Sequence, residues 1–161
     1  VLDEKVKYAL RQETSDIKDG MDMALCVVEK EADAYHVIYS GAKVDLYYHT
    51  QGSEDITIIS SERRSIGGTK QKRGNIEFTN KDFYLHKGDM IWLSTDGIID
   101  QNNSDRKRFG TPKFVETLND ITTQSLAQQK QIIEHELSEH QGDEEQRDDI
   151  TIWGIKFTDK W

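Results

Sequence analysis

The apolar run at residues 90–93 ends abruptly in Thr95-Asp96-Gly97, and this junction constrains the fold more than any other part of the sequence. A short apolar run bounded by turn residues predicts a buried strand. Such a strand delivers the carboxylate of Asp96 to its own end, and a further carboxylate follows at Asp100. Because Mg²⁺ and Mn²⁺ prefer oxygen ligands and keep several waters beside one or two carboxylates, this strand end is a candidate site for a hard divalent cation.

A second acidic position lies near the C-terminus, where Asp148-Asp149 precedes an apolar stretch at residues 150–157. Each position also has a simpler interpretation. Asp-Gly is a strong hairpin signal because both residues tolerate positive φ, so Asp96-Gly97 is compatible with a plain turn. An acidic pair before a strand is commonly a solvated strand end. The two positions together, in this order, favour a shared site.

Several short strands with helices set aside from them predict the α+β class. Apolar residues at helical spacing indicate a first helix over about residues 1–13. Thr111-Pro112 is typical of a helix start, and Ser125 with Gln128 predicts a capping box for the next helix. No repeat or linker divides the chain, so we expect residues 1–161 to form one domain. The expected strands cover residues 23–28, 35–39, 44–49, 56–60, 76–78, 83–85, 90–95 and 150–157, with a turn over residues 29–33.

Composition and charge exclude several classes of function. The formal net charge is −9, and such a surface repels phosphate backbones, so we expect no nucleic-acid binding. The chain has no apolar run long enough to predict membrane contact. Cys26 is the single cysteine, which excludes an internal disulfide and agrees with a cytoplasmic location. The basic run at residues 70–73 is either a solvated loop or a contact for a phosphorylated or acidic partner.

The order of these motifs resembles PPM-type (PP2C-like) protein serine/threonine phosphatases, and in particular their bacterial SpoIIE/RsbU-like branch. The branch has a Gly-Asp, apolar strand, Thr-Asp-Gly segment, for which this chain has Gly88 to Gly97. It also has an Asp-Asp/Asn-apolar-Thr strand, for which this chain has Asp148 to Thr151. Phe109-Gly110 stands between the two, as a Phe-Gly often does in the branch. The resemblance extends over nearly the whole chain.

The resemblance implies a PP2C-like sandwich of two mainly antiparallel sheets flanked by helices. It implies that Asp96 and Asp148 are catalytic metal ligands and that Gly97, which lacks a Cβ, allows close approach at the cofactor. Asp149 is the alternative to Asp148 as the second ligand. The implied cofactor is Mn²⁺ or Mg²⁺, in a two-metal site of the complete domain. Two upstream Gly-Asp segments of the family pattern are absent, so we expect an N-terminally truncated domain without its bridging carboxylate.

The activity implied by the resemblance is metal-dependent hydrolysis of phosphoserine or phosphothreonine on a regulatory protein, as part of a larger signalling protein. In this branch the phosphorylated protein is often an anti-sigma-factor antagonist. We expect the isolated 161-residue chain to be inactive. The alternative is a non-catalytic partner-binding module built on a degenerate phosphatase fold. Because an open sheet edge invites pairing with another chain, a homodimer is a further expectation.

Overall fold

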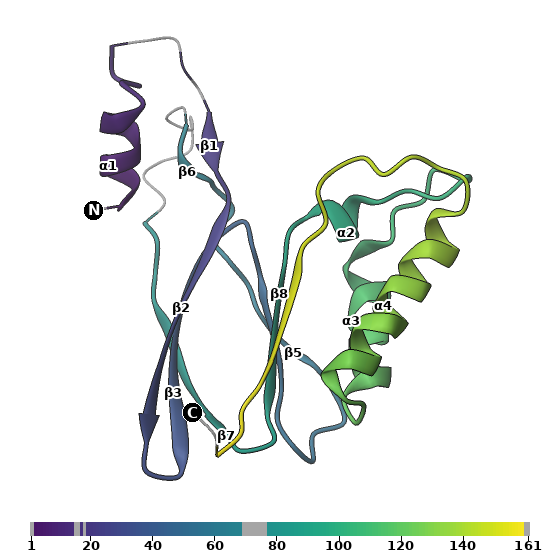
Figure 1. Cartoon of the computed structure of the whole chain (residues 1–161). Helices are drawn as coiled ribbons and strands as arrows, with labels where there is room; N and C mark the ends of the chain where they lie inside the picture. Colours follow the sequence, from purple (N-terminus) through teal and green to yellow (C-terminus); the bar gives the residue numbers. More distant parts are fainter. Residues whose placement is uncertain (1, 15–16, 18, 69–76, 160–161) are drawn as a thin grey trace.

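Two antiparallel sheets pack face to face in the computed structural model, which describes residues 2–14, 17, 19–68 and 77–159 (Figure 1). One sheet has the order β2-β3-β7 and the other β5-β4-β8-β9. A short pairing of β1 with β6 lies beyond one end of the first sheet. The strands are β1 (Gly20–Met21), β2 (Met23–Glu31), β3 (Ala34–Ala42), β4 (Leu46–His49), β5 (Thr57–Ile59), β6 (Ile66–Gly67), β7 (Lys81–His86), β8 (Met90–Ser94) and β9 (Ile152–Lys156).

Strand β8 is buried on both faces, which explains its uninterrupted apolar sequence. The side chain of Ile91 joins the core between the two sheets, together with Val37 of β3 and Leu85 of β7. Trp92, the next residue, points to the opposite face and joins the core under the helices. The strand that carries Asp96 at its end is therefore fixed from both sides.

Helices α3 (Gly110–Ile121) and α4 (Leu126–Gln141) cover the outer face of the β5-β4-β8-β9 sheet (Figure 1). Phe114 and Leu118 of α3 and Ile133 of α4 pack against that face. The predicted capping box is confirmed, because the Ser125 hydroxyl accepts from the Gln128 backbone N–H and the Gln128 side chain accepts from the Ser125 N–H. The helices of the described residues are too short or too polar to span a bilayer.

Helix α1 (Leu2–Ala9) lies beside β6, beyond the end of the β2-β3-β7 sheet (Figure 1). Asp3 ties it there, accepting from the Gly67 backbone N–H at 2.7 Å and from the Arg64 guanidinium at 2.8 Å. Burial raises the pKa of Asp3, but these hydrogen bonds and one from Lys7 outweigh it and lower that pKa to about 2. Among the described residues, helices therefore cover the outer face of the β5-β4-β8-β9 sheet. No described helix covers the outer face of the β2-β3-β7 sheet.

The α+β class and the antiparallel sandwich predicted from the sequence are confirmed. Several boundaries are wrong. The first helix ends at Ala9 rather than near residue 13, and α3 begins one residue before Thr111. The turn expected over residues 29–33 contains only residues 32–33, because β2 and β3 pair through Glu31 and Ala34. Of the strand expected at residues 76–78, residues 77–78 are in no strand, and residue 76 lies outside the described residues.

Candidate metal centre

Asp96-Gly97 begins a helix and does not form a hairpin turn. Strand β8 ends at Ser94, and α2 (Gly97–Asp100) starts immediately after Asp96. The φ of Asp96 is −69°, whereas the two-residue hairpin turn typical of Asp-Gly needs positive φ at its central residues. The Asp100 N–H donates to the Asp96 carbonyl at 2.9 Å, which closes the helical turn. The plain-turn interpretation of this segment is therefore wrong.

Thr95 joins the two acidic segments. Its N–H donates to the Thr151 carbonyl at 3.0 Å, and its hydroxyl donates to the Asp149 carbonyl at 2.9 Å. The same hydroxyl accepts from the Thr151 N–H at 3.0 Å. These bonds extend the β8–β9 pairing past the end of both strands. Asp96 follows Thr95 directly, so the bonds hold Asp96 and the Asp148-Asp149 segment at the same end of the sheet, the pairing that the order of the motifs predicts.

The linking role of Thr95 and Thr151 was not predicted from the sequence. Each threonine lies within two residues of one of the predicted ligands, Thr95 before Asp96 and Thr151 after Asp149. A hydroxyl that both donates and accepts can satisfy backbone groups at strand ends, where the sheet ladder stops. The threonine near each acidic motif was the feature of the sequence from which this link could have been predicted.

Gly97 is required by a close backbone contact. A Cβ at Gly97 would lie 2.5 Å from the Asp149 carbonyl oxygen and 3.0 Å from Cγ1 of Ile150. The resemblance implies that the missing Cβ allows an approach at the cofactor. The approach that the structure shows is to the second acidic segment, at Asp149. Gly97 therefore sets how closely that segment packs against the start of α2.

We expect Gly97→Val to destabilise the fold by about 1–3 kcal/mol, because the clash is with backbone atoms that cannot rotate away. Urea unfolding followed by circular dichroism measures this change. Gln131→Ala, on the exposed surface of α4, serves as the control and should change the free energy of unfolding by less than about 0.5 kcal/mol. A Gly97→Val protein as stable as the control would contradict the contact.

The predicted ligands are exposed and have no basic partner. Asp96, Asp148 and Asp149 are all exposed, and no ion pair within the described residues includes any of them. One Asp148 carboxylate oxygen accepts from the Asp149 N–H at 2.7 Å, which orients that side chain. Asp100 differs, because it faces the Arg108 guanidinium at 2.8 Å. The chemistry of the donor set, hard oxygens without competing cations, fits Mn²⁺ or Mg²⁺.

The described residues do not complete a metal cage at this position. No set of three acidic, histidine or cysteine ligand atoms lying within 4.8 Å of one another includes Asp96 or Asp148 in the described part of the chain. Two carboxylates and their waters make a partial site, since a two-metal centre needs ligands that bridge both ions.

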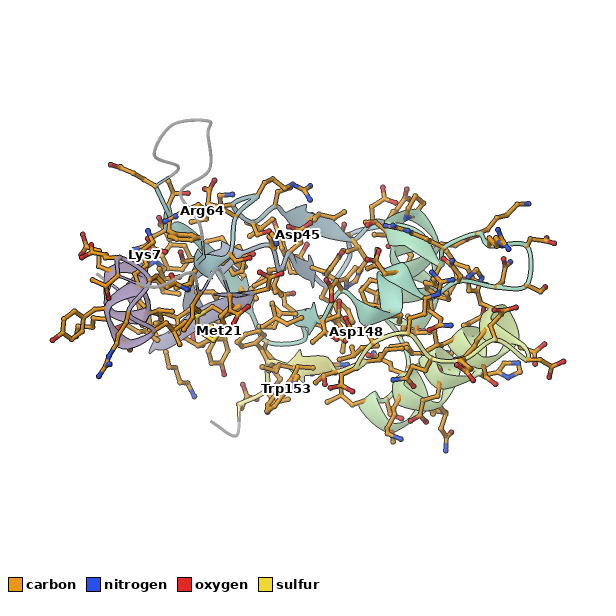
Figure 2. The ribbon with its side chains drawn as sticks, turned by 90° about the horizontal axis from the view of Figure 1, so that it is seen from above. Lys7, Met21, Asp45, Arg64, Asp148 and Trp153 are labelled. Atoms are coloured by element: carbon orange, nitrogen blue, oxygen red, sulfur yellow. The ribbon has the colours of Figure 1, made fainter. Side chains whose placement is uncertain are left out.

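A groove of about 300 Å³ adjoins this end of the sheets. Thr95 and Thr151 line it, together with Asp22 on the segment between β1 and β2. Trp153 on β9, labelled in Figure 2, also lines the groove. Its side chain is 66% exposed. Asp22 is already engaged, because it accepts from the Ser65 hydroxyl and faces Lys43. The groove gives a ligand direct access to the strand ends that precede Asp96 and follow Asp149.

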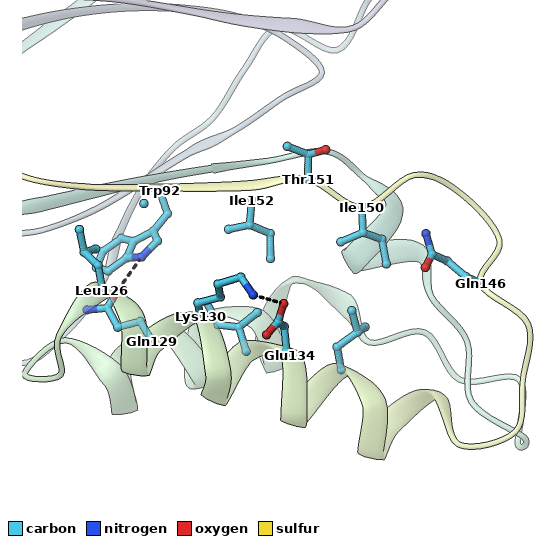
Figure 3. Close-up of a pocket in the computed structure, with 12 residues that line it drawn as sticks. Trp92, Leu126, Gln129, Lys130, Glu134, Gln146, Ile150, Thr151 and Ile152 are labelled. Atoms are coloured by element: carbon cyan, nitrogen blue, oxygen red, sulfur yellow. Dashed lines mark hydrogen bonds and ion pairs between the residues drawn. The ribbon is translucent and has the colours of Figure 1, made fainter.

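A larger cavity of about 600 Å³ lies between α4 and β9 (Figure 3). Its walls are mainly apolar, and its charged residues Lys130 and Glu134 pair with each other at 2.6 Å. Gln129 is buried and accepts from the Trp92 indole N–H at 3.3 Å. Among the described residues that line this cavity, Glu134 is the single acid, so the candidate metal site is at the strand ends near Asp96 and Asp148.

The fold matches that of known phosphatase domains. The family model described as stage II sporulation protein E (SpoIIE) matches residues 2–158. The chain belongs to the SpoIIE family. The SiaA-PP2C domain of Pseudomonas aeruginosa is 29% identical, with a TM-score of 0.75 over 96% of this chain and 59% of that domain. This SpoIIE-family chain therefore spans about three-fifths of the length of that relative. No curated protein sequence matches it.

Two more distant structures support the SpoIIE-family fold. The phosphatase domain of SpoIIE from Bacillus subtilis is 8% identical, with a TM-score of 0.63 over 99% of this chain and 66% of that domain. The RsbU and RsbW domains of Rv1364c from Mycobacterium tuberculosis are 16% identical, with a TM-score of 0.66 over 97% of this chain and 42% of that structure. The predicted resemblance to the SpoIIE/RsbU-like branch is confirmed.

Proposed function

We propose that this SpoIIE-family chain forms the Asp96/Asp148 part of a metal-dependent protein serine/threonine phosphatase site. The hydrogen bonds of Thr95 carry the proposal, because they tie the strand end that bears Asp96 to the segment that bears Asp148. Family membership and the phosphatase fold of the neighbours support the reaction class. One structural neighbour, PstP, was solved in complex with two manganese ions.

The residues of this chain would hold and orient the cofactor. Asp96 and Asp148 would be the ligands, and bound Mn²⁺ or Mg²⁺ would supply an activated water and neutralise phosphoryl oxygens. Asp149 is the alternative ligand. The backbone of Asp149 is fixed by the Thr95 hydroxyl, and its N–H orients the Asp148 carboxylate, so we assign the ligand role to Asp148 and the positioning role to Asp149.

The proposed substrate is a phosphoserine or phosphothreonine on a cytoplasmic regulatory protein, such as an anti-sigma-factor antagonist. The net charge of −9 favours a protein substrate over a nucleic acid. The basic run at residues 70–73, which the sequence indicated as a solvated loop or a partner contact, lies outside the described residues.

Homodimerisation stays a prediction. Within the described residues β2 and β9 each have one unpaired edge.

The alternative function is partner binding by a phosphatase fold without catalysis. The incomplete ligand set around Asp96 and Asp148 favours this reading for the isolated chain. The two functions differ in their need for metal, because a binding module recognises its partner without turnover.

The test uses the full-length protein that contains this chain, with a phosphoserine protein as substrate. We expect phosphate release in Mn²⁺, loss of release when EDTA removes the metal, and recovery when excess Mn²⁺ is restored. A phosphotyrosine protein is the control substrate and should be hydrolysed far more slowly. Stable binding of the phosphoprotein in EDTA, with no phosphate release in Mn²⁺, would favour the binding module and contradict the enzyme.

A further inference from the structure

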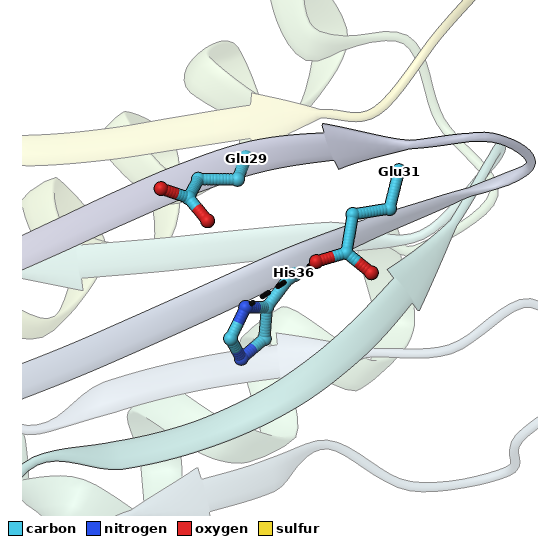
Figure 4. Close-up of side chains that lie close together, drawn as sticks. All are labelled: Glu29, Glu31 and His36. Carbon is cyan, nitrogen blue, oxygen red and sulfur yellow. Dashed lines mark ion pairs between the residues drawn. The ribbon is translucent and has the colours of Figure 1, made fainter.

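A second group of metal-ligand side chains lies on the outer face of the β2-β3-β7 sheet (Figure 4). Glu29 and Glu31 are two residues apart on β2 and therefore share that face. His36 on β3 pairs directly with Glu29 in the antiparallel register. One ligand atom from each of the three residues lies within 4.8 Å of the other two. We call these residues the hairpin cluster.

The histidine ring is fixed on three sides. Nδ1 of His36 lies 3.8 Å from a carboxylate oxygen of Glu31, and Nε2 lies 3.7 Å from a carboxylate oxygen of Asp82 on β7. The Tyr84 ring stacks on the imidazole, with 4.9 Å between ring centroids. Nε2 is sealed from solvent and has no hydrogen-bond partner among the described residues. The ring is thus held with Nδ1 toward the glutamates and without water at Nε2.

Within the described residues, no lysine or arginine pairs with the carboxylates of the hairpin cluster. The ion pairs of the described residues connect Glu31 and Asp82 to His36 alone, and Glu29 has none. Lys30 lies between the two glutamates in sequence, but alternation points it to the other face, over the Tyr35 ring. A divalent cation bound by Glu29, Glu31 and neutral His36 would neutralise both glutamates.

We propose that the hairpin cluster binds a Zn²⁺-class transition-metal ion through Glu29, Glu31 and Nδ1 of His36. An imidazole nitrogen with two carboxylates is a donor set that suits Zn²⁺ better than Mg²⁺ or Ca²⁺. Ligands at about 2.1 Å around a tetrahedral ion are roughly 3.4 Å apart, and the flexible, exposed glutamates can close the present gaps by rotamer changes. With a small rotation, the Asp82 carboxylate, now 3.7 Å from Nε2, would accept a hydrogen bond from Nε2–H, which fixes the tautomer that leaves Nδ1 free for the ion.

This site is separate from the strand-end site. The hairpin cluster lies near the β2–β3 turn, and Asp96 precedes α2 at the opposite end of the sandwich (Figure 1). The two sites also differ in chemistry, because the strand-end candidates are carboxylates alone. Metal at the hairpin cluster would link β2 to β3 and, through Asp82, position β7.

Calorimetric titration of the 161-residue chain with Zn²⁺, in excess Mg²⁺ to occupy oxygen-only sites, tests the proposal. We expect one Zn²⁺ to bind, with binding lost in His36→Gln and in Glu31→Gln. Asp82→Asn should weaken the affinity about 10- to 100-fold, the usual effect of removing the partner of a metal-bound histidine. His135→Gln, which changes an exposed histidine on α4, is the matched control and should bind as the parent chain does.

Circular dichroism of each variant excludes misfolding as the cause of lost binding. Histidine ring NMR gives an independent readout, since Zn²⁺ should shift the His36 resonances before those of His135. Equal Zn²⁺ affinity in His36→Gln and His135→Gln would overturn the proposal. So would His36 ring resonances that do not respond to Zn²⁺, because the hairpin cluster would then not hold the metal.

Discussion

Asparagine at Asp96 or at Asp148 in the full-length protein should lower phosphatase turnover by about two to four orders of magnitude. Asparagine keeps the shape of aspartate but loses the charge that holds a hard cation. Both carboxylates are exposed and unpaired in the described part of the chain, so the fold should tolerate the change. Phosphate release at saturating Mn²⁺, with thermal unfolding measured in parallel, separates lost catalysis from lost stability.

Two further variants test whether the effect is specific to the proposed ligands. Asp143→Asn changes an exposed acid in the loop between α4 and β9, which also contains Asp148. This variant should leave turnover near that of the parent protein. Asp149→Asn should have a smaller effect than Asp148→Asn if Asp149 acts only through its backbone. The reverse order would make Asp149 the ligand. Near-normal turnover in both Asp96→Asn and Asp148→Asn would remove this strand end from the mechanism.

The 161-residue chain alone should bind Mn²⁺ weakly and be almost inactive, and adding the upstream part of the domain should restore activity. The described residues supply no third ligand to Asp96 and Asp148, and the chain matches only 59% of the SiaA-PP2C domain. A working site needs its groups held to within about 0.5 Å, which two exposed carboxylates at a strand end do not ensure.

Hydrolysis of p-nitrophenyl phosphate and of a phosphoserine protein by the two chains, at equal concentration and saturating Mn²⁺, measures this difference. The extended chain should also sediment as a better-defined species, because added strands would cover an open sheet edge. Equal turnover by the short and extended chains would place the catalytic groups within residues 1–161 and away from the proposed site.

Local patterns in the sequence were sufficient to predict some helices and strands. The apolar run at residues 90–93 predicted a buried strand, and Ser125 with Gln128 predicted a helix start. The plain-turn interpretation of Asp96-Gly97 is wrong, because Asp96 has a helical φ and α2 begins at Gly97. The Asp149 backbone packs against Gly97, and the Thr95 hydroxyl bonds to that same segment, and neither contact has a local signature.

The hairpin cluster likewise depends on contacts between strands that have no local signature in the sequence. No local motif marks His36 as a ligand, and the cross-strand register decides that its neighbours are Glu29 on one side and Tyr84 on the other. The position of the turn sets that register, and the predicted turn over residues 29–33 begins three residues before the observed one. Ligand sets that form across strands therefore require the strand pairing, whereas the Asp96 and Asp148 motifs were visible within single segments.

The bond between Thr95 and Thr151 has a consequence for folding order. The two residues are 56 positions apart, and α2, α3 and α4 lie between them. Contacts of such long sequence separation carry a loop-closure cost and tend to form after local helices. The strand-end site should therefore assemble late in folding and open early when β9 detaches. Metal affinity at Asp96 and Asp148 would then report whether the final strand is docked, making the site a sensor of the integrity of its own domain.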